Sequence, residues 1–248
     1  MVEFTVKIAG YAIAIKALYP ETKELFRDYF TEEQPFVTIE SSKELIVAER
    51  QLLKKADVEE RLPVDSFSDA EIESNFLYRE VAEQLSTHET VLIHGSAVAV
   101  DGEGYIFVAP SGTGKSTHVR LWRKMFGSRA VMINDDKPLL QCADDGITVC
   151  GSPWDGKHHL SASISVPLKA ICFLERGKDN HIVAISNTEG FMPMLKAIYH
   201  SKEAEREACI LQSLQRIRQK TSFYRLWCNM EPDAAMVSYE GMKHERCI

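Results

Sequence analysis

The chain has 248 residues, of which 45% are hydrophobic, and a formal net charge of −7 at pH 7. A chain of this length and apolar content can bury a sizeable core, and it lies near the boundary between one large domain and two. The negative charge gives no general attraction to nucleic-acid phosphates or anionic lipids, which argues against nucleic acid and membrane partners. An anionic ligand would therefore need a local binding site.

The cysteines and the N-terminus indicate the compartment. The six cysteines show neither a CxxC spacing nor a cysteine–histidine ligand pattern, which argues against structural zinc and a disulfide framework. The first residues, MVEFTVKIAG, carry charges early and alternate between apolar and polar, unlike a signal peptide or a membrane span. We expect a soluble cytoplasmic protein. The sequence leaves the oligomeric state open, with a homo-oligomer among the alternatives.

The N-terminal region is expected to be rich in strands. Residues 2–8 alternate with the period of a strand, and the apolar phase changes after Ala9-Gly10, which indicates a turn or a bulge. A further strand is expected over residues 35–40. Residues 44–49 fit either another strand or the start of a helix.

A helix is then expected over residues 69–85. Ser68 and Glu71 have the spacing of a capping box, and apolar residues recur behind them at helical intervals. We assign residues 1–88 to an N-terminal α/β region that packs on a core of residues 89–248. The whole chain is expected to have a mixed α/β fold.

The core is expected to begin with two apolar strands, 90–100 and 105–110, around the turn DGEG. A helix follows with one apolar side and ends at Gly127, a suitable C-cap. A short buried strand, AVMIN, then leads into Asp135 and Asp136.

The C-terminal part predicts two hairpins, a helix, a strand and a last short helix. The hairpins are expected around ADDG (143–146) and RGKDN (176–180), and the helix over about 202–220. The helix side expected to face the core consists of Ala204, Ala208, Leu211, Leu214 and Ile217.

One stretch, IFVAPSGTGKSTHVRLW, carries a phosphate-loop pattern. The pattern is a glycine, four residues and Gly-Lys-Ser/Thr, placed between a strand and a helix. Every element is present except the first glycine, where the chain has Ala109. The backbone amides of such a loop and of the helix start surround an anion. Lys115 adds a positive charge, and Ser116 offers an oxygen to Mg²⁺ on the phosphates.

The pattern therefore predicts that a nucleoside triphosphate binds at this loop. The expected contacts are Ser111, Gly112, Thr113, Gly114, Lys115, Ser116 and Thr117. The alternative, a glycine-rich turn that contains Lys-Ser by chance, is disfavoured by the strand before the loop and the helix after it.

Two carboxylates are expected near this loop. A parallel strand beside the loop strand would bring Asp135 and Asp136 to the same edge of the sheet. One could hold Mg²⁺ and the other could accept a proton from an attacking hydroxyl. We place Asp135 with Ser116 at the metal and Asp136 at the proton, although the sequence does not decide between the two aspartates. The alternative role of the pair is a turn or a helix cap.

The loop SGTGKST and the strand end NDD resemble the catalytic domain of HPr kinase/phosphorylase and, more distantly, the nucleotide site of ATP-dependent phosphoenolpyruvate carboxykinase. The resemblance includes His94-Gly95 ahead of the loop and covers about residues 91–136. It implies a core of that fold with ATP and Mg²⁺ at the loop, Lys115 on the phosphates and Ser116 near the metal. It also implies that the aspartate pair shares metal binding and general-base work on a serine hydroxyl.

The chain also departs from that family. HPr kinases carry an acidic residue after the loop serine, where this chain has Thr117, and their N-terminal domain and HPr-docking signature are not recognisable. HPr is therefore not the expected acceptor. The chain looks more like the stand-alone kinases of peptide-modification pathways, such as lasso peptide biosynthesis, that phosphorylate a peptide serine.

Three further residues are candidates for the site. His94 is either a buried strand histidine or a site residue. Lys157, in the segment GSPWDGKHHLS with an exposed-looking Trp154, could neutralise charge on the transferred group, unless this segment is a solvated surface loop. Arg176 could approach the triphosphate, although a charged hairpin turn accounts for it more simply.

The sequence thus predicts an ATP- and Mg²⁺-dependent kinase that transfers the γ-phosphoryl group to a hydroxyl, with a serine of a peptide or small protein as the expected acceptor. The alternatives are a kinase for a small hydroxylated metabolite and an ATP-binding regulatory module with little catalysis. The sequence does not decide whether the reverse, phosphorolytic reaction occurs.

Overall fold

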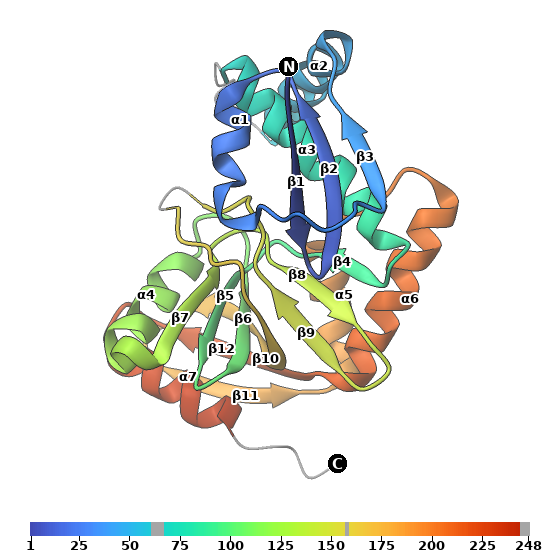
Figure 1. The fold of residues 1–248 in the computed structure, drawn as a ribbon. Coiled ribbons are helices and arrows are strands. Elements are labelled where there is room, and N and C mark those ends of the chain that lie inside the picture. The colour runs from blue at the N-terminus through green and yellow to red at the C-terminus, as the bar shows by residue number, and fades with distance from the viewer. Residues whose placement is uncertain (61–66, 157–158, 244–248) are drawn as a thin grey trace. The chain divides into compact units, whose positions relative to one another are not determined.

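The computed structural model describes residues 67–156 and 159–243 together with residues 1–60, of which only the backbone is described for 56–60. The chain divides into two compact units, residues 1–84 and 85–248, and each has its own sheet (Figure 1). In the described part of the chain, no helix has both the length and the apolar character needed to cross a membrane.

The first unit contains a three-stranded sheet in the order β1-β2-β3. Strands β1 (Val2–Ile8) and β2 (Tyr11–Ala17) form an antiparallel hairpin, and β3 (Val37–Glu40) pairs with β2 in parallel. The predicted turn is confirmed, since Ala9 and Gly10 both have positive φ, 48° and 84°. This geometry matches the twist of the strands that it joins.

Helices complete the first unit. They are α1 (Pro20–Leu25), a 3₁₀ turn (Arg27–Tyr29), α2 (Lys43–Glu60) and α3 (Asp69–Ser86), whose last residues extend into the second unit. The helix alternative for residues 44–49 is therefore the right one. The capping box that predicts α3 is present, because the Glu71 amide donates to Ser68 Oγ at 3.2 Å and the Ser68 amide to Glu71 Oε2 at 2.8 Å.

A buried carboxylate joins α3 to the rest of the first unit. Glu73 is fully buried and accepts hydrogen bonds from the amides of Leu18 and Tyr19 at 2.6 and 3.2 Å. It also accepts from the hydroxyl of Thr22 at 2.5 Å and from that of Ser41. This one side chain thus satisfies donors from three segments, and no sequence pattern singled it out.

The second unit is built on a curled sheet of nine described strands. Its main path follows the order β4-β8-β9-β10-β6-β5-β7, and β12 pairs with β10 and β11. The strands are β4 (Thr90–Leu92), β5 (Ser96–Val100), β6 (Glu103–Val108), β7 (Ala130–Asn134), β8 (Leu139–Cys142), β9 (Ile147–Cys150), β10 (Ser165–Arg176), β11 (His181–Ile185) and β12 (Ser222–Cys228).

The strand that leads into the loop lies in the middle of this sheet. β6 pairs with β10 in parallel and with β5 antiparallel, and β7 pairs with the other edge of β5, again antiparallel. The expectation that the AVMIN strand lies directly beside the loop strand is therefore wrong, since β5 lies between them. Because β6 and β7 are both antiparallel to β5, they run in the same direction and their carboxyl ends reach the same edge of the sheet.

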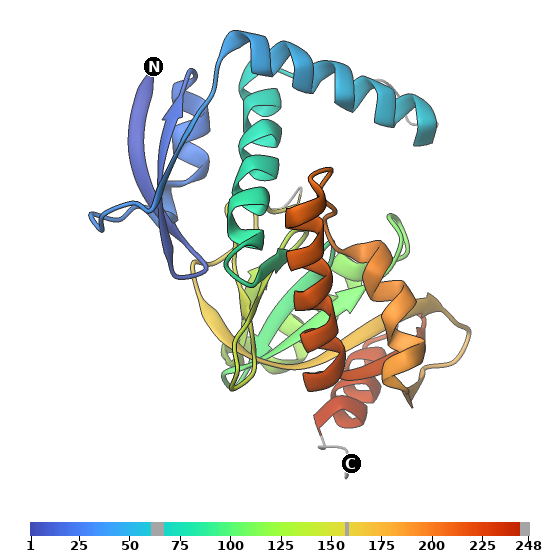
Figure 2. The ribbon, with the colours of Figure 1, turned by 90° about the vertical axis from the view of Figure 1, so that its right-hand side faces the viewer.

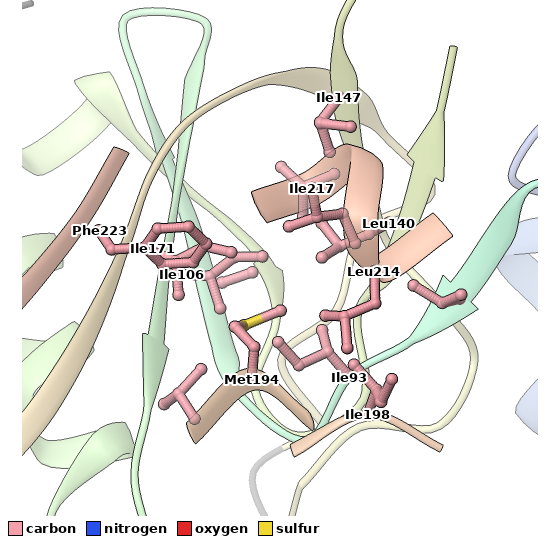
Figure 3. Close-up of a cluster of buried hydrophobic side chains, with 14 of the residues drawn as sticks. Ile93, Ile106, Leu140, Ile147, Ile171, Met194, Ile198, Leu214, Ile217 and Phe223 are labelled. Atoms are coloured by element: carbon pink, nitrogen blue, oxygen red, sulfur yellow. The ribbon is translucent and has the colours of Figure 1, made fainter. Parts of the chain in front are cut away.

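Helices cover both faces of the sheet (Figures 1 and 2). Along β6, Ile106 and Val108 belong to a core with α5 (Asn187–Ala197) and α6 (Ala204–Lys220), which Figure 3 shows. The alternate residues Tyr105 and Phe107 belong to a second core with α4 (Lys115–Phe126) and α7 (Asp233–Lys243). This alternation explains the continuous apolar sequence of β6, because a strand buried on both faces has no solvent-facing side.

Several sequence expectations need correction. β11 pairs with β12, which lies between it and β10, so the second predicted hairpin does not form. The sequence expectations contain no helix over residues 187–197, where the structure has α5, although Ser186 and Glu189 form a capping box at its start. The buried residues of α6 are Ile210, Ser213, Leu214 and Ile217, whereas Leu211 is exposed.

Candidate functional site

The glycine loop, residues 109–114, connects β6 to α4. Gly112 and Gly114 have φ of 74° and 124°, a region that residues with a side chain rarely adopt. Gly114 is the N-cap of α4, and no side chain of the described residues caps this helix start. The amides of the first turn of a helix have no partner within the helix. This end of α4 therefore offers hydrogen-bond donors and the positive end of a helix dipole.

Lys115 lies against the glycine loop. Its side chain is buried, and its Nζ donates to the Ala109 carbonyl at 2.9 Å. Burial lowers the pKa of Lys115, while the negative charges of Asp136 and Asp135 raise it. The ammonium group can donate two further hydrogen bonds.

Asp135 is the buried member of the aspartate pair, with 6% of its surface exposed. Ser96 Oγ lies 3.2 Å from Asp135 Oδ1 and 3.0 Å from its carbonyl oxygen. A Cβ built on Gly156 would lie 3.1 Å from Asp135 Oδ2, so that a larger residue there would press on this oxygen. Asp135 and Ser116 line one cavity of about 320 Å³.

Asp136 is more accessible, with 29% of its side chain exposed. Its Oδ1 lies 3.4 Å from His94 Nε2, and its Oδ2 lies 3.2 Å from Lys137 Nζ. His94 belongs to a bend between β4 and β5 rather than to a strand, and 49% of its side chain is exposed. The interpretation of His94 as a buried strand histidine is therefore wrong.

Asn134, at the end of β7, holds the backbone that carries both aspartates. Its Oδ1 accepts from the amides of Asp136 and Lys137 at 2.8 and 2.6 Å. Its Nδ2 donates to the carbonyls of Ser152 and Trp154 at 3.0 and 3.2 Å. The NDD sequence contained this signal, because a side-chain oxygen two residues before an amide is the geometry of an Asx turn.

The segment after β9 also approaches the site. Trp154 is 6% exposed, which corrects its expected exposure. Asp155 lies 3.2 Å from His159 Nδ1. Lys157, the candidate for neutralising charge, lies outside the described residues.

Arg176, at the end of β10, contacts the glycine loop. Its Nη2 donates to the Gly112 carbonyl at 2.6 Å, and both residues line a second cavity of about 460 Å³. Thr113, Gly114, Thr117 and residues 228–230 also line this cavity. The preferred interpretation of Arg176 as a turn residue therefore missed its contact with the loop.

The described residues form no group of three histidine, cysteine, aspartate or glutamate side chains that could hold a metal ion on their own. A metal at Ser116 and Asp135 would therefore need further ligands from a bound molecule or water. This is the usual situation of Mg²⁺, which keeps waters and shares substrate phosphates.

A family model described as "SynChlorMet cassette protein ScmC" matches residues 69–235, more than half of the chain. The chain belongs to the ScmC family. The region of this ScmC-family chain that matches contains the glycine loop, both aspartates and Arg176. Its description names a cassette rather than a reaction.

Comparison with curated proteins gives no match to this ScmC-family chain. Among solved structures, it is similar to the HPr(Ser) kinase/phosphatase from Coxiella burnetii, with 10% identity and a TM-score of 0.30 over 52% of this chain and 96% of that chain. A likeness at this level carries no argument about the reaction.

Proposed function

We propose that this protein binds ATP with Mg²⁺ and transfers the γ-phosphoryl group to the hydroxyl of a serine in a peptide or small protein. The observation that carries the proposal is the cavity shared by Ser116 and Asp135, at the start of a helix whose Lys115 Nζ lies against the glycine loop, 2.9 Å from the Ala109 carbonyl. A phosphate loop, a lysine and two carboxylates at one sheet edge are the parts that phosphoryl transfer requires.

The residues fit a nucleoside triphosphate. The glycine loop and the uncapped start of α4 supply amide donors, and Lys115 supplies a positive charge that is partly removed from water. Ser116 and Asp135 are the oxygen ligands available for Mg²⁺. When bound, Mg²⁺ would neutralise charge on the phosphates.

The different environments of the two aspartates support different roles. Asp135 is buried, its Oδ1 lies 3.2 Å from Ser96 Oγ, and it lines one cavity together with Ser116, which suits a metal ligand. Asp136 is partly exposed and its amide donates to Asn134 Oδ1, which suits a base that must reach an entering hydroxyl.

In the proposed step, the serine proton moves to the Asp136 carboxylate as the serine oxygen bonds to the γ-phosphorus. The bond from that phosphorus to the bridging oxygen breaks, and ADP leaves with the electron pair. His94, whose Nε2 lies 3.4 Å from Asp136 Oδ1, would then take the proton onward.

Mass spectrometry of serine-containing peptides incubated with the full chain, ATP and Mg²⁺ tests the reaction. We expect a phosphorylated peptide together with an equal amount of ADP. Lys115→Ala should abolish transfer because the phosphates lose their charged partner. Asp136→Asn should keep ATP binding and lower turnover at least roughly 100-fold, because the base is lost.

Asp145→Asn is the matched control, since it removes an exposed carboxylate in the β8–β9 turn and should leave turnover unchanged. Detectable transfer by the Lys115 variant, or turnover of the Asp136 variant close to that of the wild-type chain, would contradict the proposal. ATP binding without any ADP formed in response to peptides would favour a regulatory module, and phosphorylation of a small hydroxylated compound instead of peptides would favour a metabolite kinase.

A further inference from the structure

The cavity that Ser116 and Asp135 line extends along α4, away from the glycine loop. Its described lining comprises Ser116, Thr117, Val119, Arg120, Arg123, Met132, Asp135 and Leu160. Asp135 is the one acidic side chain in this lining. The cavity thus has a metal-ligand end, an apolar wall and a basic end.

The basic end is formed by Arg120 and Arg123. They are three residues apart, so that they share one side of α4. Neither guanidinium forms an ion pair or a hydrogen bond with another residue in the described part of the chain. In a protein with a net charge of −7, two arginines that face a cavity without a carboxylate partner are available for an anionic ligand.

The distance of Arg120 and Arg123 from Ser116 argues against contacts between these arginines and the phosphates of ATP. At 1.5 Å of rise per residue, Arg120 and Arg123 lie about 6 and 10 Å from Ser116 along the helix axis. The triphosphate is expected at the amides of the helix start, on the other side of Ser116. The distance to the arginines corresponds to about two to three residues of extended chain.

Building on the proposed kinase function, we propose that Arg120 and Arg123 bind a carboxylate of the acceptor, two to three residues from the serine that is phosphorylated. Arginine forks match carboxylates with paired hydrogen bonds. Val119, Met132 and Leu160 cover the acceptor between its hydroxyl and its carboxylate. The carboxylate can come from an aspartate or glutamate side chain or from the C-terminus of the acceptor, since both offer the same pair of oxygens.

Peptide binding to the full chain tests this inference, with Mg²⁺ and a non-hydrolysable ATP analogue present. Three synthetic probes are used: a blocked serine peptide with one aspartate two residues after the serine, its asparagine counterpart, and an otherwise neutral serine peptide with a free C-terminal carboxylate two residues after the serine. We expect at least one carboxylate probe to bind roughly tenfold more tightly than the asparagine probe. The carboxylate probe that binds more tightly identifies the source.

The double variant Arg120→Gln/Arg123→Gln should bind all three probes equally, because the carboxylate has lost its partners. Lys124→Gln is the matched control, since it removes an exposed positive charge of α4 that does not line the cavity. The control should keep the preference of the wild-type chain. Equal or undetectable binding of all probes to the wild-type chain would overturn the inference, as would a preference that survives in the double variant.

Binding of a fluorescent ATP analogue, measured on the same proteins, distinguishes this inference from the proposed function. The double variant should bind it as the wild-type chain does, whereas Lys115→Ala should not. Weaker nucleotide binding by the double variant would place the arginines on the phosphates and overturn the inference alone. Nucleotide binding that is absent from the wild-type chain would contradict the proposed function itself.

Discussion

At the scale of single residues, the site depends on polar side chains whose partners lie far away in the sequence. Lys115, Ser116 and the two aspartates follow from a motif, and the sequence therefore predicts them. Arg176 does not follow from a motif, because an arginine at a strand end is common. The Asx-turn spacing of NDD indicates the contact of Asn134 with the next amides but not its contacts across the sheet. The contacts of Asn134 with the segment after β9 and of Arg176 with the glycine loop exist only once the sheet has formed.

A buried histidine in the second unit makes stability depend on pH. His118 is 2% exposed, lies 2.9 Å from Ser238 Oγ through its Nε2, and packs edge-on against Phe107. Burial lowers the pKa of His118 to about 4. The unfolded chain binds a proton at this residue near its ordinary pKa of about 6.5, so stability is fully present above that pH and is lost as the pH falls towards 4.

We therefore expect His118 to contribute a loss of up to about 3 kcal/mol in the free energy of unfolding between pH 7 and pH 4. Urea unfolding at several pH values measures it. His118→Gln, which does not titrate, should lose correspondingly less than the wild-type chain over this range. The same pH dependence in both proteins would show that His118 binds its proton over the same pH range in the folded and the unfolded chain.

At the scale of elements, local signals predicted the helices and turns better than the strand pairing. The capping box of α3, the Ala9-Gly10 turn and the glycine after α4 each act within a few residues, and all three are present. The position of β5 between β6 and β7, and that of β12 between β10 and β11, depend on contacts between distant segments. Apolar periodicity gives the faces of a strand but not its neighbours.

In the first unit, the Glu73 side chain connects helix α3 to the neighbouring segments, and its removal tests how much that connection stabilises the unit. Glu73→Ala would leave the amides of Leu18 and Tyr19 and the hydroxyl of Thr22 without their acceptor, whereas the Ser41 hydroxyl keeps the Lys16 carbonyl at 3.2 Å. Since each buried donor without a partner costs about 1–3 kcal/mol, we expect a loss of at least about 3 kcal/mol in the stability of this unit.

Urea unfolding measures that loss of stability, and amide hydrogen exchange of the native protein shows in which unit it occurs. Exchange should accelerate in residues 1–84 of the Glu73 variant and stay slow in the strands of the second unit. Glu73→Gln keeps one acceptor oxygen and should cost less than Glu73→Ala. Equal stability of the alanine variant and the wild-type chain would show that solvent satisfies these donors.

At the scale of the whole molecule, the chain forms two compact units, each with its own sheet, and the residues of the proposed reaction all lie in the second unit. Because β6 and β7 run in the same direction, their ends bring the glycine loop and the aspartates to one edge of the sheet, even though β5 separates them. The central claim is that the start of α4 and Asp135 together bind a triphosphate with Mg²⁺.

Calorimetric titration of ATP into the full chain, with and without Mg²⁺, tests this claim most directly. We expect Mg²⁺ to strengthen ATP binding by at least about tenfold in the wild-type chain. In Asp135→Asn the gain from Mg²⁺ should be largely lost, while ATP still binds without the metal. Equal affinity with and without Mg²⁺ in the wild-type chain, or the same gain in the Asp135 variant, would contradict the account.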